Sequence, residues 1–160
     1  MDKELRWFKT PEEADIIFSL FVEYVSEWRT RIPALRSWSF NFHQSREKMQ
    51  NKHSSETGAH VEYFPSYEDA TVTVFLPDGV EWNEADIEET SVHELMHCLL
   101  STLLEACIAY IEVTPQVEAV LSLLEEQTCT RLACGFMKTK YPDFETSPAH
   151  ASRATGVKAS

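Results

Sequence analysis

The chain has 160 residues, of which 43% are apolar and 11% aromatic, and its formal net charge is −12. This length and apolar content suit one domain with a hydrophobic core of its own. The acidic balance argues against nucleic acid or an anionic membrane surface as a partner, because both are negatively charged.

Export and membrane insertion are not expected. The first residues, MDKELRWFKTPEEAD, lack the apolar segment of a signal peptide, and no stretch reaches about 18 consecutive apolar residues. All four cysteines fall in segments predicted to be helical, not in loops at disulfide spacing. We therefore expect reduced thiols and a cytoplasmic protein.

A helix is predicted to begin at Thr10 and Pro11, with Thr10 as the cap and Glu13 completing a capping box. Apolar residues then recur at helical spacing as far as Trp28, and this spacing indicates one buried face. Pro33 is expected to end the helix.

Three strands are predicted next. Residues 37–44 alternate between aromatic and polar side chains, which is typical of a half-buried strand. Residues 59–64 and 70–76 read as two further strands, and the turn between them is short enough for an antiparallel hairpin. We therefore expect a small, three-stranded, mostly antiparallel sheet.

Two helices complete the predicted fold. Asn83 is expected to cap a helix over residues 84–110, whose acidic first turns suit the positive end of the helix dipole. Thr114 and Pro115 begin the last helix, which ends near Pro142. The order of helix, strands and two helices predicts an α+β domain over residues 1–142, and the small polar residues 143–160 predict a disordered tail.

The motif HELMH, residues 93–97, lies inside the predicted helix over residues 84–110. His93 and His97 are four residues apart, so they project from the same helix face and can share one metal ion. Glu94 lies about 100° further round the helix, beside the ion, where a general base for a metal-activated water belongs. This spacing predicts a catalytic Zn2+ site that needs a third protein ligand.

The alternative interpretation of the motif is a pair of surface histidines on an acidic helix. Against it, Met96, Leu99, Leu100 and Leu103 flank the histidines, so this part of the helix is expected to be buried or to line a cleft.

The third ligand is expected in the segment LLEEQTCTRLA. Glu125 and Glu126 interrupt an apolar helix there, and they point about 100° apart. We therefore expect one of them to face the metal and the other to lie on a solvated helix face. Periodicity alone does not choose between them, because both share a stripe with apolar residues.

The stretch TSVHELMHCLL, followed by EEQTCTRLA, resembles the small gluzincin metallopeptidases, notably short phage and bacterial proteins of this type. The hairpin sequence AHVEYFPSYEDATVTVFLP before the motif is also similar to theirs. The resemblance covers roughly residues 38–133. It implies a minimal zincin-like fold and a cytoplasmic hydrolase, in the host cytoplasm if the protein is phage-encoded.

Transferred residue by residue, the resemblance implies that His93 and His97 bind zinc, that Glu94 is the base, and that Glu126 is the third ligand, with Glu125 as the alternative. Thr130 departs from the family pattern, which has Asp or Asn four residues after the ligand glutamate. No electrophilic helper is identified, although Tyr110, Tyr141 and Arg131 are candidates.

The expected function is therefore a zinc-dependent metallopeptidase that acts on a peptide or protein substrate. We expect the substrate to align along an edge strand, residues 70–76. The alternative is a non-catalytic phage or bacterial accessory protein that binds a protein partner and uses zinc as a structural clamp.

Overall fold

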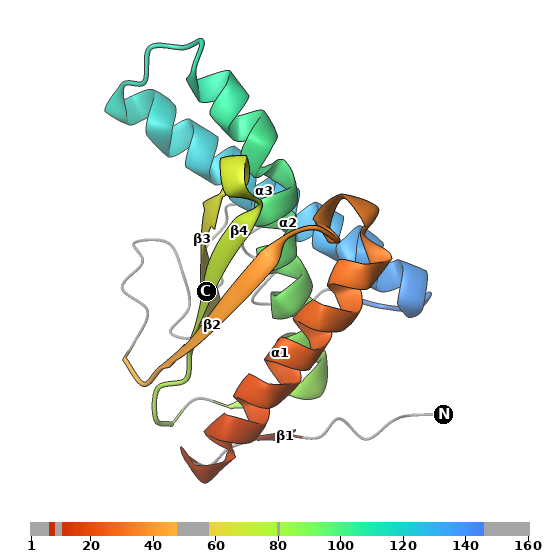
Figure 1. The fold of residues 1–160 in the computed structure, drawn as a ribbon. Helices are drawn as coiled ribbons and strands as arrows, with labels where there is room; N and C mark the ends of the chain where they lie inside the picture. Colours follow the sequence, from red (N-terminus) through yellow and green to blue (C-terminus); the bar gives the residue numbers. More distant parts are fainter. Residues whose placement is uncertain (1–6, 9–10, 48–57, 80, 146–160) are drawn as a thin grey trace.

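The computed structural model describes residues 7–8, 11–47, 58–79 and 81–145. The class is α+β, as predicted, with helices packed beside a small sheet (Figure 1). The long helices of the described residues are α1 (Ala14–Arg31), α2 (Glu84–Ile108) and α3 (Pro115–Lys140). The strands are β1 (Trp7–Phe8), β2 (Ser39–Ser45), β3 (Gly58–Phe64), β4 (Asp69–Phe75) and β5 (Trp82–Asn83). Short 3-10 turns are η1 (Pro11–Glu13), η2 (Pro33–Leu35) and η3 (Pro65–Tyr67).

The larger sheet has the strand order β2-β4-β3. The predicted hairpin is confirmed, since β3 and β4 pair antiparallel, but β2 pairs parallel with β4. The sheet is therefore mixed and not mostly antiparallel. The central strand, β4, is also deeply buried: its residues Ala70, Val72 and Val74 are at most 1% exposed.

This strand order overturns the expectation that residues 70–76 form an edge strand. Both edges of β4 are hydrogen-bonded to neighbours, so β4 has no free edge on which a peptide could align. The outer strands of this sheet are β2 and β3, and β3 is the one that packs against α2. A second, two-stranded sheet of β1 and β5 was not predicted.

Helix α2 is the central element of the domain, because it packs against α1, α3 and β3. Its N-terminus is capped as predicted: the Asn83 side chain accepts a hydrogen bond of 2.8 Å from the backbone N–H of Asp86. Thr114 caps α3 in the same way, accepting from the N–H of Val117 at 3.3 Å. The predicted cap Thr10 and the predicted tail beyond Glu145 lie outside the described residues.

A buried ion pair fixes the C-terminal end of α3 against α1 and α2. Glu88 of α2, only 3% exposed, accepts hydrogen bonds from Trp28 Nε1 (2.8 Å), Lys140 Nζ (2.7 Å) and Tyr141 OH (2.9 Å). Lys140 also contacts Glu27 at 3.0 Å. These carboxylate bonds join three helices at one point, which gives Glu88 a structural role beyond the helix dipole.

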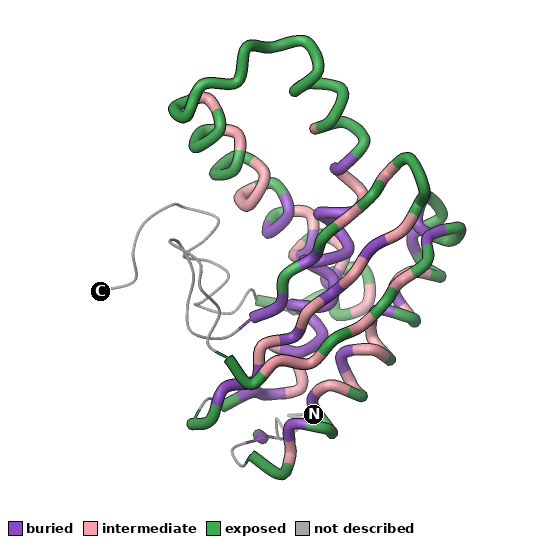
Figure 2. Tube along the Cα trace, turned by 60° about the vertical axis from the view of Figure 1, so that its left-hand side comes forward, coloured by how far each residue is buried: buried purple, intermediate pink, exposed green. Residues whose placement is uncertain are grey.

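The C-terminal part of α2 and the N-terminal part of α3 project from the domain as a helical hairpin, residues 102–124, called the arm below (Figure 1). None of its residues is buried (Figure 2). Leu103, predicted to be buried, is 62% exposed, so that expectation is wrong. Apolar spacing continues along α2, but the sheet and α1 end before the helix does.

Candidate metal centre

Two helices bring three potential ligands together. His93 and His97 lie one turn apart on α2, and α3 crosses this face of α2 with Glu126 opposite them. The two Nε2 atoms are 3.2 Å apart, and the Glu126 carboxylate oxygens lie 3.4 Å from Nε2 of His93 and 3.5 Å from Nε2 of His97. The structure therefore brings together the ligands that the motif and the family resemblance predict.

These distances are short enough for the three side chains to share one metal ion. Ligand bonds of about 2.0–2.2 Å at the tetrahedral angle place neighbouring ligand atoms roughly 3.3–3.6 Å apart. The two Nε2 atoms are 3.2 Å apart, and each faces a different Glu126 oxygen, Oε2 at 3.4 Å from His93 and Oε1 at 3.5 Å from His97. One ligand atom from each of the three residues lies within 4.8 Å of the other two. An imidazole nitrogen and a carboxylate oxygen each offer a lone pair, so their convergence calls for a shared cation or proton.

Glu125 orients His97 from the other side of its ring. Its carboxylate lies 2.8 Å from Nδ1 of His97, and a carboxylate accepts hydrogen bonds, so Nδ1 carries the proton. Nε2 of His97 then keeps its lone pair for the metal. Tyr63 of β3 also donates to the Glu125 carboxylate, at 3.3 Å. Such carboxylate–histidine pairs fix the ligand ring and increase its basicity.

The electrostatic surroundings favour a positive charge at His97. Burial lowers its pKa, but hydrogen bonds with Cys129 and Glu125 and the nearby charge of Glu94 outweigh burial, so the pKa lies well above the ordinary histidine value. Burial, opposed by His97, raises the pKa of the Cys129 thiol. The carboxylates of Glu125 and Glu94 therefore favour positive charge at His97, whereas the Cys129 thiol stays protonated.

Glu94 lies beside this triangle and is not part of it. Its side chain is 4% exposed, and its charge acts on both His97 and Cys98, whose pKa is raised by burial first and by Glu94 second. The set of side chains that could hold a metal contains His93, His97 and Glu126 without Glu94. Glu94 is therefore a buried carboxylate that acts electrostatically on His97 and lies outside the group of possible metal ligands.

The site is buried on the side of α2 and more open on the side of α3. The side chain of His93 is 1% exposed and that of His97 11%, whereas that of Glu126 is 41% exposed. Glu126 is therefore the member of this group that has the most contact with solvent.

The expectation that either Glu125 or Glu126 lies on a solvated helix face is wrong. Both reach the site, because they approach opposite edges of the same His97 ring. Thr130, the departure from the family pattern, donates to the backbone carbonyl of Glu126 at 2.9 Å and so stays within α3.

Tyr63 supports Glu125 and was not predicted from the sequence. The alternation of side chains along β3 could have indicated it, because Tyr63 lies on the same face of the strand as the buried Val61. The proposed helpers lie elsewhere: Tyr110 is 90% exposed at the end of the arm, and Tyr141 donates to Glu88. Arg131 is exposed on α3.

Comparison of the chain with models of known protein families, with curated proteins and with solved structures finds no match. None of the described helices is both long and apolar enough to cross a membrane. The function is therefore inferred from the residues of the candidate metal centre.

Proposed function

We propose that the chain is a zinc-dependent metallopeptidase of the gluzincin type. The observation that carries this proposal is the convergence of His93 Nε2, His97 Nε2 and the Glu126 carboxylate, whose ligand atoms lie within 4.8 Å of one another. Glu94 beside this triangle supports catalysis over a purely structural role, because a structural site has no use for an adjacent base.

Zinc is the metal that this donor set favours. Two imidazoles and one carboxylate in a tetrahedral arrangement are typical of catalytic zinc, which leaves one position open. Harder cations such as Mg2+ and Ca2+ prefer sites built from six or more oxygen atoms. The hydrogen bond between Glu125 and His97 is the outer support that such sites normally contain.

A bound zinc ion would act as a Lewis acid on a water molecule and on the peptide carbonyl. In this proposal Glu94 accepts the proton of the attacking water and passes it to the leaving amine. Glu125 holds the His97 ring in the tautomer that exposes Nε2. His93 and Glu126 complete the ligand set.

The substrate of this proposed activity is an extended peptide. The sheet edge nearest to the site is β3, because β3 packs against α2 and its Tyr63 reaches Glu125. No described strand pairs with the outer side of β3. A peptide could therefore add to β3 through backbone hydrogen bonds, in place of the β4 strand expected from the sequence.

The experiment that tests this proposal compares the native chain with Glu94→Gln on a broad peptide library, with zinc measured in the same samples. The amide has nearly the shape of the carboxylate but accepts no proton. We expect equal zinc content and a fall in cleavage of about 10²-fold or more. Equal cleavage by both proteins, or loss of zinc in Glu94→Gln, would contradict the role of Glu94.

A second candidate function is a non-catalytic protein that binds a partner and uses zinc as a structural clamp. The exposed apolar side chains of the arm favour it. This candidate predicts no cleavage by the native chain and unchanged partner binding in Glu94→Gln.

A further inference from the structure

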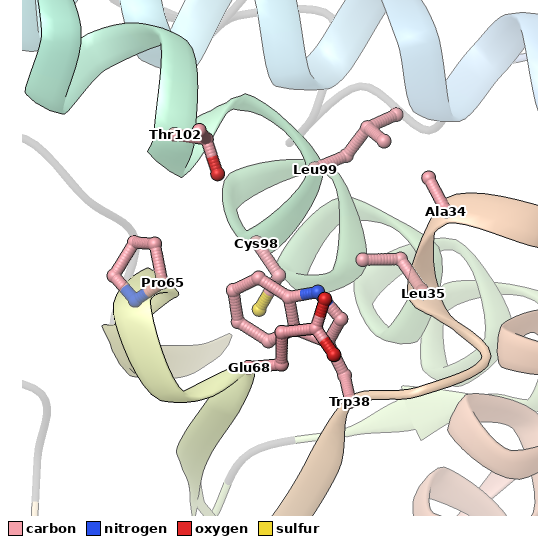
Figure 3. A pocket seen from close by; sticks show the side chains of 8 residues that line it. All are labelled: Ala34, Leu35, Trp38, Pro65, Glu68, Cys98, Leu99 and Thr102. Atoms are coloured by element: carbon pink, nitrogen blue, oxygen red, sulfur yellow. The ribbon is translucent and has the colours of Figure 1, made fainter.

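A pocket of about 150 Å³ opens where α2 meets the two turns η2 and η3 (Figure 3). Leu35, Trp38, Pro65 and Leu99 give it apolar walls. By helix spacing, Leu99 projects from a different face of α2 than the two histidines, and none of His93, His97 and Glu126 lines the pocket. Its volume suits one long side chain and is too small for most free metabolites.

One carboxylate, that of Glu68, lines this pocket (Figure 3). Glu68 has a left-handed backbone conformation, with φ of 50°, which is uncommon for a residue other than glycine. The backbone holds it there, because its carbonyl accepts from the N–H of Ser39 at 2.8 Å. No described residue forms an ion pair with its carboxylate. The chemistry of the pocket therefore matches an aliphatic stem with a cationic end.

The pocket adjoins the arm. Thr102 lines the pocket, and the next residue, Leu103, is 62% exposed. Further exposed apolar side chains follow along both helices of the arm and the turn between them: Ile108, Tyr110, Ile111, Val113, Val120, Leu123 and Leu124. A helical hairpin in which no residue is buried gains little stability from its own packing, so a covering partner would supply what the arm lacks.

Charge identifies the kind of partner. The sequence contains no Lys or Arg from residue 53 to residue 130, while Glu105, Glu112 and Glu118 are exposed on the arm. A second copy would bring these carboxylates against their own counterparts, and an anionic lipid surface would also repel them. A cationic segment would pair with them.

We infer that the arm and the pocket form a docking surface for a cationic amphipathic helix of a partner protein. The apolar face of this helix covers the arm, and one of its Lys or Arg side chains enters the pocket. There the aliphatic stem contacts Leu35 and Leu99, and the charged end meets the Trp38 ring and the Glu68 carboxylate.

A synthetic helix of Leu and Lys, with all Leu on one face, tests this inference by calorimetric titration. Two control peptides are a scrambled sequence of the same composition and a Leu and Glu helix. We expect binding of the first peptide alone. Binding of the scrambled peptide with the same affinity, or no binding of any peptide, would overturn the inference.

Variants locate the surface. Leu103→Ser and Glu68→Gln should each weaken binding at least about tenfold, through lost apolar contact and lost charge pairing. Their matched controls, Ile16→Ser and Glu23→Gln, change exposed residues of α1 and should bind as the native chain does. Unchanged affinity in either test variant would contradict the proposed surface.

Two further outcomes would reassign the arm. A dimer in light scattering that Leu103→Ser abolishes would show that a second copy covers it, and partition into neutral lipid vesicles would show a membrane contact. Either result overturns the inference. Zinc content, measured on every variant, should stay unchanged because no substituted residue belongs to the metal centre. This separates a failure of docking from a failure of the proposed function.

Discussion

Two adjacent glutamates of α3 contact different nitrogen atoms of one histidine ring. Glu126 meets the Nε2 edge of His97, at 3.5 Å, and Glu125 meets the Nδ1 edge, at 2.8 Å. Neighbouring helix residues diverge by about 100°, so only a ring placed between them can contact both. In the proposed site, the position of the His97 ring therefore makes Glu126 the metal ligand and Glu125 the residue that supports the ring.

The two glutamates should differ in their effect on zinc. Glu126→Gln removes a ligand charge and should abolish stoichiometric binding. Glu125→Gln leaves the ligand set complete but weakens the support of His97, so affinity should fall about 10–100-fold. Competition with a chromophoric chelator measures both affinities.

Tyr63→Phe is the control for these two variants. It removes only the 3.3 Å hydrogen bond to Glu125, so it should weaken zinc binding less than either glutamate substitution. A larger loss of zinc in Glu125→Gln than in Glu126→Gln would show that the ligand is Glu125.

The residues of the site that lie close together in the sequence were predictable, and those that come from other elements were not. His93, Glu94 and His97 lie within five consecutive residues of one helix, so helix geometry alone brings them together. Periodicity left Glu125 and Glu126 undecided, because their roles depend on how α3 crosses α2. Tyr63 comes from a third element, and its contact follows from sheet packing.

At the scale of elements, α2 combines three functions along its length. Its first turns carry the Asn83 cap and Glu88, its middle carries the two histidines of the proposed metal site, and its last turns form the arm. The N-terminal half is held by α1 and by the end of α3, so the ligands project from a rigid part of the helix. Catalytic geometry benefits from such support.

Glu88→Ala tests this support. The substitution leaves the Lys140 ammonium, the Trp28 N–H and the Tyr141 hydroxyl without their shared acceptor. Removal of one partner of a buried ion pair costs about 3–5 kcal/mol, and the lower end applies because Lys140 still reaches solvent. Urea denaturation measures the free energy of unfolding.

Glu27→Ala is the matched control, since Glu27 contacts the same Lys140 but its side chain is 34% exposed. Its loss should cost less than about 1 kcal/mol. A similar loss of unfolding free energy in Glu88→Ala and Glu27→Ala would mean that the burial of Glu88 adds nothing to the stability of the fold.

The elements themselves were largely predictable, whereas their arrangement was not. Asn83 and Thr114 mark both helix starts, and alternation identifies the strands. The position of β4 between β2 and β3 depends on which strand gains most stability from pairing on both edges. That comparison involves all strands of the sheet and cannot be made from one segment. The exposure of Leu103 likewise depends on where the neighbouring layers end.

At the scale of the whole molecule, a bound metal would join α2 to α3, two of the three long helices among the described residues. Ligands that bind only the folded state stabilise it, by about 2.7 kcal/mol when free ligand is 100-fold above Kd. Zinc should therefore raise Tm in scanning calorimetry, and a chelator should reverse the rise.

His93→Ala is the control for this effect, since it should unfold at the same temperature with and without zinc. A zinc-dependent rise of equal size in His93→Ala would place the stabilising metal at another site.

The proposed zinc site is tested most directly by a crystal structure of the zinc-loaded protein with anomalous diffraction recorded at the zinc edge. We expect one anomalous peak about 2.0–2.2 Å from Nε2 of His93, Nε2 of His97 and an oxygen of Glu126. We also expect a fourth position open to solvent, with Glu94 beside the ion and outside its ligand set. A peak at other residues, Glu94 or Glu125 bound to the metal, or a fourth position filled by a protein ligand would rule out the proposed site.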